Sequence, residues 1–325
     1  MPLDALDALY VNLTKDTYNN VCGYDIPRCT KYEDLPYEYI EPHVLGTGSY
    51  GKVSVYKKKY KNTNNIPQEL FCIKEIKLTD SILSDKDNLC EIIKEYFILN
   101  YIACENPYVL CFIECVLNEE YMWLITTYES GAIDLFEYIR TIKPGGFLSY
   151  LRIIDICDQL IQGLMFLHSK EIYHLDIKAE NIIYNTNTKT VKYIDFGLSC
   201  IKQYKCIIGG TITYCPPEIM LLRLGKNVFE EGRQHKIIYT TIMYDKCDIY
   251  SLGVTLYYLI SKTYPRDIIE NSYTTIYGSI KPLHCKKELE SLAKIIMNMI
   301  SMNPNDRPPL NTINETIKSL KLIHK

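Results

Sequence analysis

The sequence predicts a mixed α+β fold with two lobes, a small β-rich lobe followed by a larger and mainly helical one. Strand-like runs bounded by turn residues occupy the chain up to about residue 128, and helical periodicity dominates beyond it. The 325 residues, 47% of them hydrophobic, suffice for two ordinary domains or for one large two-lobed unit with a sizeable core.

The small lobe is expected to contain several strands and one key helix. The helix should run from about Asp87 to Ala103, because Cys90, Ile93, Phe97 and Tyr101 fall on one side of it. The predicted strands are 39–45, 52–58, 69–77, 109–116 and 122–128.

The domain boundaries follow from these elements. Residues 1–37 are expected to form an N-terminal extension, either an arm packed on the small lobe or a regulatory segment. Residues 38–325 should form the two-lobed domain, with the N-lobe at 38–128, the hinge at 127–131 and the C-lobe at 132–325.

Composition and charge exclude several classes of protein. A net charge of −3 provides no basic field for nucleic acid or for an anionic membrane. Asp4 and Asp7 argue against a signal peptide, and the longest apolar stretch, 249–260, is too short to span a bilayer. We therefore expect an intracellular, cytoplasmic protein without membrane insertion, in the host cytoplasm or nucleus if the gene is viral.

The cysteines are expected to be reduced thiols. There are thirteen of them, an odd number, in a long chain without a Cys-x-x-Cys pair. A disulfide scaffold is more typical of small exported proteins.

The most informative stretch runs from His174 to Asn181 and is followed by Asp195-Phe-Gly. Phosphoryl transfer from ATP needs an Asp that orients the acceptor hydroxyl and takes its proton, an amide oxygen for one Mg²⁺, and a second Asp for the metals on the phosphates. Asp176, Asn181 and Asp195 supply these groups in that order. The two-part pattern is much more specific than either part alone.

This pattern resembles the catalytic and magnesium loops of eukaryotic protein kinases. The resemblance implies that Asp176 is the catalytic base, that Lys178 neutralises the transferring phosphoryl group, and that Asn181 and Asp195 hold Mg²⁺. It covers about residues 38–320.

The glycine-rich segment 46–53 and the strand ending at Lys74 resemble the nucleotide-binding elements of the same family. A glycine-rich turn alone would fit a dinucleotide fold or a hairpin equally well, but Val53 continues into a strand rather than a helix. Lys74 should bind the α- and β-phosphates, and Glu95 is its expected helix partner, with Glu91 as the alternative.

The resemblance also assigns the remaining nucleotide contacts. Asp134 is placed to reach the ribose, although a helix cap is its simpler explanation. The other residues expected around ATP are Gly46, Gly48, Ser49 and Gly51 at the phosphates, Val53, Cys72 and Ile183 at the adenine, Thr126 at the back of the pocket, and Thr127 and Tyr128 in the hinge.

Structural motifs extend the resemblance. The segment Cys215-Pro-Pro-Glu218 stands where kinases carry Ala-Pro-Glu, and Glu218 is expected to form a buried ion pair with Arg307. The segment beginning at Asp248 resembles the buried helix that anchors the catalytic loop. Small-molecule phosphotransferases that share the two-lobed core lack these motifs.

Two departures from the family pattern stand out. Leu175 replaces the Arg that usually receives an activation-loop phosphate, so the change indicates different regulation rather than an inactive enzyme. Glu218 and Asp248 are unusually far apart, with an insert at about 225–241 that is either a docking surface or a tolerated surface loop.

We therefore predict a serine/threonine protein kinase that transfers the γ-phosphoryl group of Mg·ATP to protein hydroxyls. Lys178 and Thr211 occupy positions typical of serine/threonine rather than tyrosine kinases, and Thr211 should bond near Asp176. A pseudokinase scaffold that binds nucleotide or a partner without turnover is the alternative, and tyrosine or dual specificity is a weaker one. The expected partners are protein substrates, with no nucleic acid.

Overall fold

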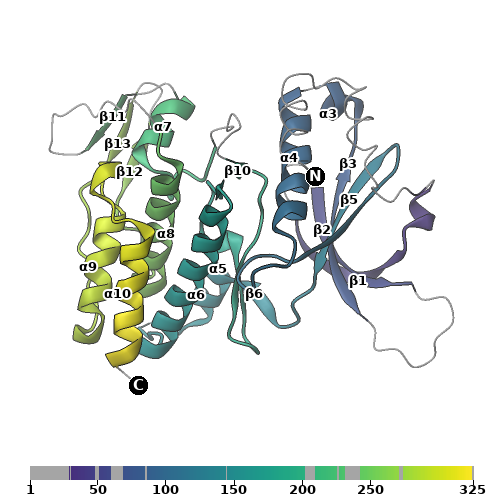
Figure 1. The fold of residues 1–325 in the computed structure, drawn as a ribbon. Helices are drawn as coiled ribbons and strands as arrows, with labels where there is room; N and C mark the ends of the chain where they lie inside the picture. The colour runs from purple at the N-terminus through teal and green to yellow at the C-terminus, as the bar shows by residue number, and fades with distance from the viewer. Residues whose placement is uncertain are drawn as a thin grey trace. The chain divides into compact units, whose positions relative to one another are not determined.

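The computed structural model describes residues 29, 31–47, 51–59, 69–84, 86–143, 145–201, 209–224, 227–230, 242–270 and 274–323. The chain divides into two compact units, Met1–Ser130 and Gly131–Lys325. The first unit carries a large antiparallel sheet, and the second carries most of the helices (Figure 1). The predicted mixed α+β fold is therefore confirmed.

The N-terminal unit is built on a five-stranded antiparallel sheet with the strand order β1-β2-β3-β5-β4. Each predicted strand is present, with its ends shifted by a few residues. The strands are β1 (Tyr37–Thr47), β2 (Gly51–Lys58), β3 (Leu70–Lys77), β4 (Phe112–Leu117) and β5 (Tyr121–Thr127). The short helices η1 (Tyr32–Asp34) and α3 (Asp80–Ser84) were not predicted.

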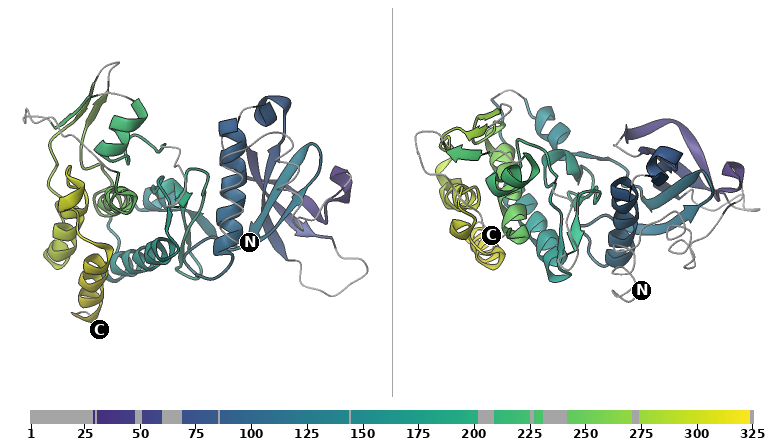
Figure 2. Two further views of the ribbon diagram at one scale, coloured as in Figure 1. Left: turned by 45° about the horizontal axis from the view of Figure 1, so that its top comes forward. Right: turned by 90° about the horizontal axis from the view of Figure 1, so that it is seen from above.

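Helix α4 (Lys86–Ile102) is the helix predicted at about 87–103, and it lies along the sheet in both views of Figure 2. Ile93 and Phe97 are buried as its periodicity predicts. Tyr101, predicted on the same side, is 41% exposed, because the last turn buries Ile102 instead.

The core of the N-terminal unit begins before β1. Leu35 and Tyr37 are almost fully buried, in a cluster with Phe71 and Trp123. The Tyr37 ring meets the Phe71 ring edge-on at 5.2 Å, and its hydroxyl donates to Glu114 Oε1. The end of the segment 1–37 thus packs into this unit.

The expectation of reduced thiols is wrong for at least three cysteines. Cys104 and Cys111 form a disulfide, with their Cα atoms 4.4 Å apart, and Cys200 is also disulfide-bonded. Cys104 and Cys111 flank a tight turn between α4 and β4. The spacing of cysteines in the sequence does not reveal that proximity, because the turn itself brings them together.

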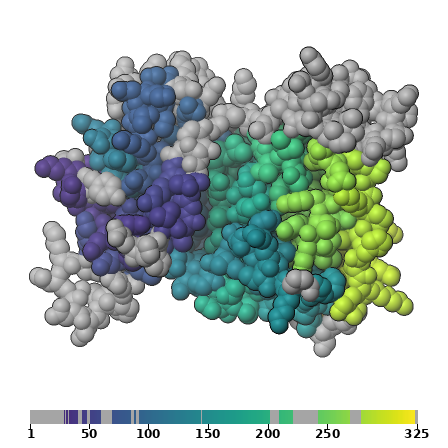
Figure 3. Space-filling view, turned by 180° about the vertical axis from the view of Figure 1, so that it is seen from behind, coloured from purple at the N-terminus to yellow at the C-terminus, as the bar shows by residue number. Residues whose placement is uncertain are grey.

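The C-terminal unit is organised around α8 (Tyr244–Ser261), which is buried along nearly its whole length. Helix α10 (Leu310–Ile323) packs beside α6 (Tyr150–Ser169), where Gln162 donates to Asn314 Oδ1 over 2.8 Å. Helix α10 reaches the surface of this unit, where it is coloured yellow in Figure 3. The other helices are α5 (Leu135–Thr141), α7 (Pro217–Leu224), α9 (Glu290–Met299) and the short η2 (Ala179–Asn181), η3 (Lys287–Leu289) and η4 (Pro304–Asp306).

Short strands position the loops of this unit. The first small sheet has the order β6-β8-β9, and β7 pairs with β10. These strands are β6 (Ala132–Asp134), β7 (Ile172–Tyr173), β8 (Ile182–Asn185), β9 (Val191–Tyr193) and β10 (Cys200–Ile201).

A second small sheet, not predicted from the sequence, has the order β11-β13-β12. Strand β11 (Asn227–Glu230) belongs to the predicted insert and runs parallel to β13 (Thr274–Tyr277), which pairs antiparallel with β12 (Ile268–Glu270). Residues 225–226 and 231–241 lie outside the described part of the chain. None of the helices in the described ranges has the length and apolar character that a membrane span requires.

Candidate active site

The loop from His174 to Asn181 is anchored by the buried carboxylate of Asp248 in α8. The backbone N–H of His174 donates to Asp248 Oδ2 over 2.9 Å, and that of Leu175 donates to Oδ1 over 2.8 Å. His168 Nε2 lies 2.9 Å from the same Oδ2 atom. Leu175 has φ of 60°, a backbone conformation that needs this kind of fixation in a non-glycine residue. Anchoring of the loop by this helix is as the sequence predicts.

The side chains of this loop converge on Asp176. Thr211 donates to Asp176 Oδ1 from its backbone N–H over 2.9 Å and from its hydroxyl over 3.0 Å. Asn181 Nδ2 donates to Asp176 Oδ2 over 2.9 Å. Lys178 Nζ lies 3.1 Å from Oδ2 and donates to the Thr211 hydroxyl over 2.8 Å. Four predicted site residues are therefore in direct contact.

This network fixes the chemistry that each group can offer. Both Asp176 oxygens accept charge-assisted bonds, which hold the carboxylate in one orientation. The Asn181 amide nitrogen faces Asp176, so its amide oxygen is the atom left to act as a metal ligand. The sequence motif named these residues, but only the fold shows that Thr211 bonds Asp176 through two separate donors.

Asp195 is connected to the same loop through its neighbours. The Ile194 backbone N–H donates to the Asn181 carbonyl over 3.0 Å, and His174 Nε2 lies 3.0 Å from the Ile194 carbonyl oxygen. Phe196 is fully buried against the His174 ring, with the ring centroids 5.1 Å apart. Asp195 itself is exposed, with φ of 61°. His174 and Phe196 therefore position Asp195. Neither residue was predicted to have this role.

Lys74 and Glu95 form an ion pair within the N-terminal unit. Lys74 Nζ lies 2.8 Å from Oε1 and 2.7 Å from Oε2 of Glu95, and the two side chains are 18% and 6% exposed. Strand β3 carries the lysine and α4 carries the carboxylate. Of the two predicted partners, Glu91 and Glu95, this contact belongs to Glu95.

Packing explains one of the two described glycines of the predicted phosphate loop, Gly51 but not Gly46. A Cβ atom at Gly51 would lie 2.3 Å from the Glu75 carbonyl oxygen, so the pairing of β2 with β3 already requires glycine there. A Cβ atom at Gly46 would meet nothing within 4 Å. The packing of the described residues therefore gives no reason for glycine at 46. Gly48 and Ser49 lie outside the described residues.

Cys72 of β3 pairs with Thr126 near the end of β5, and the predicted hinge residues Thr127 and Tyr128 follow directly. The Thr126 hydroxyl donates to the Cys72 carbonyl over 3.3 Å, while the buried Thr127 hydroxyl has no hydrogen-bond partner. Burial, with a smaller contribution from Glu129, raises the pKa of the Cys72 thiol to about 12. The Cys72 thiol is therefore neutral at physiological pH. Val53 and Tyr128 are half-buried.

The two nucleotide residues predicted in the C-terminal unit are paired across β6 and β8. Asp134 stands opposite the half-buried Ile183 in the register of these strands. Asp134 Oδ1 accepts from the Glu137 backbone N–H over 2.7 Å and caps α5. The capping function that the sequence left open is present, and the ribose contact stays a prediction.

A buried ion pair joins Glu218 and Arg307, as the sequence predicts. Arg307 donates to both carboxylate oxygens, and its Nη2 lies 2.9 Å from Oε2. The side chains are 1% and 0% exposed, respectively. The guanidinium group also lies 4.9 Å from the ring centroid of Tyr250 and donates to three backbone carbonyls, those of Lys246, Ser301 and Met302.

Leu175 belongs to an apolar cluster of the C-terminal unit. The residue is 8% exposed and packs with Cys200 of β10, Cys215 and Cys247, together with Ile219, Met220 and Met302. An aliphatic side chain thus occupies the position where the family usually places an Arg.

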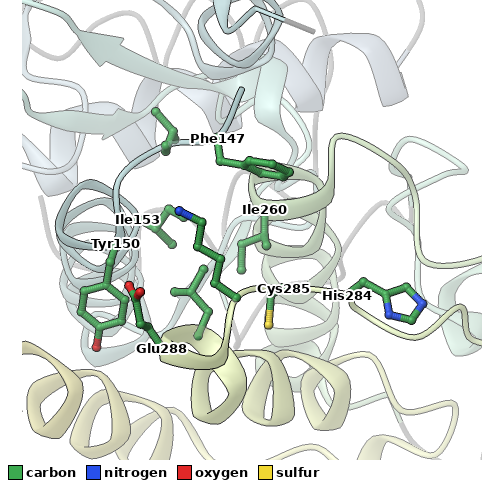
Figure 4. Close-up of a pocket in the computed structure, with 10 residues that line it drawn as sticks. Phe147, Tyr150, Ile153, Ile260, His284, Cys285 and Glu288 are labelled. Atoms are coloured by element: carbon green, nitrogen blue, oxygen red, sulfur yellow. The ribbon is translucent and has the colours of Figure 1, made fainter. Parts of the chain in front are cut away.

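An apolar cavity of about 310 Å³ lies elsewhere in the C-terminal unit (Figure 4). Its walls include Phe147, Tyr150, Ile153, Ile260 and Cys285. None of the predicted catalytic, nucleotide or metal residues lines it.

Comparisons with known proteins show the family of the chain. The family model described as protein kinase domain matches residues 39–317. The Raf homolog serine/threonine-protein kinase of Caenorhabditis elegans is 27% identical over 91% of this chain and 34% of its own length. The kinases TAO3 of Xenopus laevis and Nek3 of Mus musculus are 31% and 28% identical, over 72% and 85% of this chain.

The chain belongs to the protein kinase domain family. It spans 23% to 48% of the length of these three relatives, each of which is named a serine/threonine-protein kinase.

Proposed function

We propose that this chain is a serine/threonine protein kinase that transfers the γ-phosphoryl group of Mg·ATP to Ser and Thr hydroxyls of proteins. The observation that carries the proposal is the hydrogen-bonded set of Asp176, Lys178, Asn181 and Thr211. Its membership of the kinase family and the names of its relatives support the same activity. We also propose an intracellular location for the enzyme, in the cytoplasm or the nucleus.

Asp176 is the proposed base. Its carboxylate is held by Thr211 and Asn181, which orients it to accept the proton of a substrate hydroxyl. Lys178 adds a positive charge 3.1 Å from Asp176 Oδ2, where it would stabilise the charge that develops on the transferring group. Fixing these groups in advance reduces the reorganisation needed during the reaction.

Asn181 and Asp195 are the proposed Mg²⁺ ligands. They supply an amide and a carboxylate oxygen, the hard donors that Mg²⁺ prefers, and phosphate oxygens and waters commonly complete such a site. Bound Mg²⁺ would neutralise charge on the phosphates. The backbone bond between Ile194 and Asn181 keeps the two ligands on adjoining segments.

In the N-terminal unit, Lys74 is the proposed ligand of the α- and β-phosphates, held by Glu95. Gly46 fits an approach of phosphate to the backbone, because no described protein atom occupies the space that a Cβ would take. The Thr127 hydroxyl, buried without a partner, is available to a ligand at the hinge. The remaining proposed nucleotide contacts are Gly48, Ser49, Gly51, Val53, Cys72, Thr126 and Tyr128, with Asp134 and Ile183 from the C-terminal unit.

The proposal is tested by incubating the purified chain with radiolabelled ATP, Mg²⁺ and three peptide libraries that differ only in a Ser, Thr or Tyr acceptor. Label in the Ser and Thr libraries is expected. Nucleotide binding without any transfer would favour the pseudokinase alternative, and label confined to the Tyr library would assign tyrosine specificity.

Activity is expected not to depend on phosphorylation of the activation segment. Leu175 lies in an apolar cluster and offers no charge to a phosphate. Ser199 is fully buried and donates to the His174 carbonyl over 3.1 Å, while Tyr204 lies outside the described residues. Phosphatase treatment, checked by mass spectrometry, should leave the rate nearly unchanged. A loss of about tenfold or more, roughly 1.4 kcal/mol in barrier height, would contradict this expectation.

Substrate choice should include a modest preference for basic residues near the target hydroxyl. Glu180 has a buried carboxylate oxygen without a hydrogen-bond partner, and such a group attracts guanidinium ions. Tyr258, which is stacked on Phe136, stands where enzymes of strong basic preference often carry a second carboxylate. We therefore expect only about 1 kcal/mol for each exposed pairing.

The measurement is a positional peptide scan at low and high salt, because screening weakens exposed charge pairs. Glu180→Gln should reduce the basic preference, whereas Glu315→Gln, at an exposed Glu on α10, serves as the matched control. Strong selection for acidic residues would overturn the expectation.

A further inference from the structure

The disulfide between Cys104 and Cys111 lies in the N-terminal unit, where α4 ends and β4 begins. It links the turn after α4 to the residue just before β4. Cys104 is exposed and Cys111 is half-buried. Because access decides which sulfur of a disulfide is attacked, a small thiol in solution would reach Cys104 first.

The bridge adds to backbone bonds that tie three elements together. The Phe112 N–H approaches the Ala103 carbonyl at 3.5 Å, which connects β4 to the end of α4. The Cys111 carbonyl accepts from the Thr127 N–H over 3.1 Å, which connects the bridge to the end of β5. The same α4 helix carries Glu95, the partner of Lys74. The disulfide therefore restrains both α4, which carries Glu95, and the end of β5, where the proposed hinge begins.

We propose that Cys104 and Cys111 form a thiol–disulfide exchange site whose oxidised form orders the end of α4 and the end of β5. A thiolate of a small thiol attacks the Cys104 sulfur, and Cys111 leaves as a thiolate and takes up a proton. A second small-molecule thiolate then attacks the small-molecule sulfur of the mixed disulfide, and Cys104 leaves as a thiolate and takes up a proton. Two small thiols are thereby oxidised to one disulfide while the protein disulfide is reduced to two thiols.

The residues around the Cys104–Cys111 bridge are compatible with reversible thiol–disulfide exchange. The Cys104 sulfur lies 3.3 Å from the Phe112 carbonyl oxygen, so the reduced thiol would have an acceptor without a rearrangement of the turn. Burial raises the pKa of both Cys29 and Cys72 above the ordinary thiol value. These two thiols of the same unit are thus poor competitors for exchange.

The test begins with the intact chain equilibrated in glutathione buffers from fully reducing to fully oxidising. Free thiols are blocked with an alkylating reagent, and peptide mapping measures the Cys104–Cys111 bridge. Hydrogen exchange of the 99–103 and 126–128 amides is measured on the same samples. We expect a reversible transition in the bridge, with exchange about tenfold faster after reduction. A bridge that never forms, or exchange that is equal in both states, overturns the proposal.

Variants separate the bridge from general effects of reductant. Cys104→Ser and Cys111→Ser should show the fast exchange of the reduced protein in every buffer. Cys285→Ser, which removes a free half-buried thiol of the C-terminal unit, should respond as the wild type does. If the serine variants still show a redox-dependent exchange rate at these amides, another group is responsible and the proposal fails.

A kinetic measurement extends the proposal to nucleotide binding. Of the measurements described for this proposal, it is the one that rests on the proposed function. Reduction should raise the KM for ATP several-fold, because Lys74 and the hinge residues bind the nucleotide. An unchanged KM would overturn the functional consequence, while the exchange data would still test the site itself. A chain without any turnover would count against the proposed function and leave the amide measurement valid.

Discussion

Replacement of Asp195 by Asn is expected to lower phosphotransfer by about a thousandfold or more while leaving the fold intact. The carboxylate is the proposed Mg²⁺ ligand, and its loss removes charge stabilisation of the phosphates. Asp195 is exposed with φ of 61°, a conformation that Asn tolerates better than Ala does. Asp195→Ala should be equally inactive, but with a small loss of stability from the backbone. The measurement is the rate of peptide phosphorylation beside thermal unfolding.

Two other substitutions in the proposed site should lower activity in different ways. Asp176→Asn should lower kcat more than it weakens nucleotide affinity, since the base acts in the chemical step. Lys74→Met should also abolish transfer. This substitution leaves the Glu95 carboxylate, in a side chain that is 6% exposed, without its lysine partner. The double variant Lys74→Met with Glu95→Gln should therefore be more stable, and it is the better variant for measuring activity.

The matched control is Asp267→Asn, which removes another exposed aspartate, one that pairs with Lys281 at the surface. It should leave the rate unchanged. Turnover retained in Asp195→Asn, with normal unfolding, would refute the kinase mechanism.

Arg307→Met is expected to destabilise the C-terminal unit by about 3–5 kcal/mol. The substitution leaves the Glu218 carboxylate buried without its bidentate partner, and three backbone carbonyls also lose a donor. Removing one partner of a buried ion pair lowers the free energy of unfolding much more than removing an exposed pair does. The measurement is urea unfolding, followed by a probe that reports on this unit.

Two further variants locate the origin of that loss. The double variant Arg307→Met with Glu218→Leu should recover part of the stability, because the unpaired charge is removed. Arg140→Met removes an exposed pair with Glu137 and should cost less than about 1 kcal/mol. If Arg307→Met were as mild as Arg140→Met, the pair would not be the structural element that its burial indicates.

Periodicity predicted the sheet of the N-terminal unit well, because its strands are long and consecutive. The parallel pairing of β11 with β13 escaped prediction, since it joins short segments that are far apart in the sequence. No local pattern encodes such a pairing. The bridge between Cys104 and Cys111 was missed for a related reason, because the turn after α4 sets their distance.

For the candidate site, motifs identified the residue types but not their contacts. The sequence favoured Glu95 over Glu91 as the partner of Lys74. In the structure β3 and α4 bring the side chains of Lys74 and Glu95 together. The helix cap made by Asp134 is a local contact that the sequence already suggested, whereas the buried position of Leu175 depends on tertiary packing. The roles of all these residues in nucleotide binding and transfer stay predictions until the variants are measured.

The strand supplied by the insert limits how the chain can be shortened. Deletion of 225–241 would remove β11, and the backbone N–H and C=O groups of β13 that it pairs with would become an open edge. Open edges promote association between sheets of neighbouring molecules. A shortened chain that is to remain free of aggregation should therefore retain Asn227–Glu230.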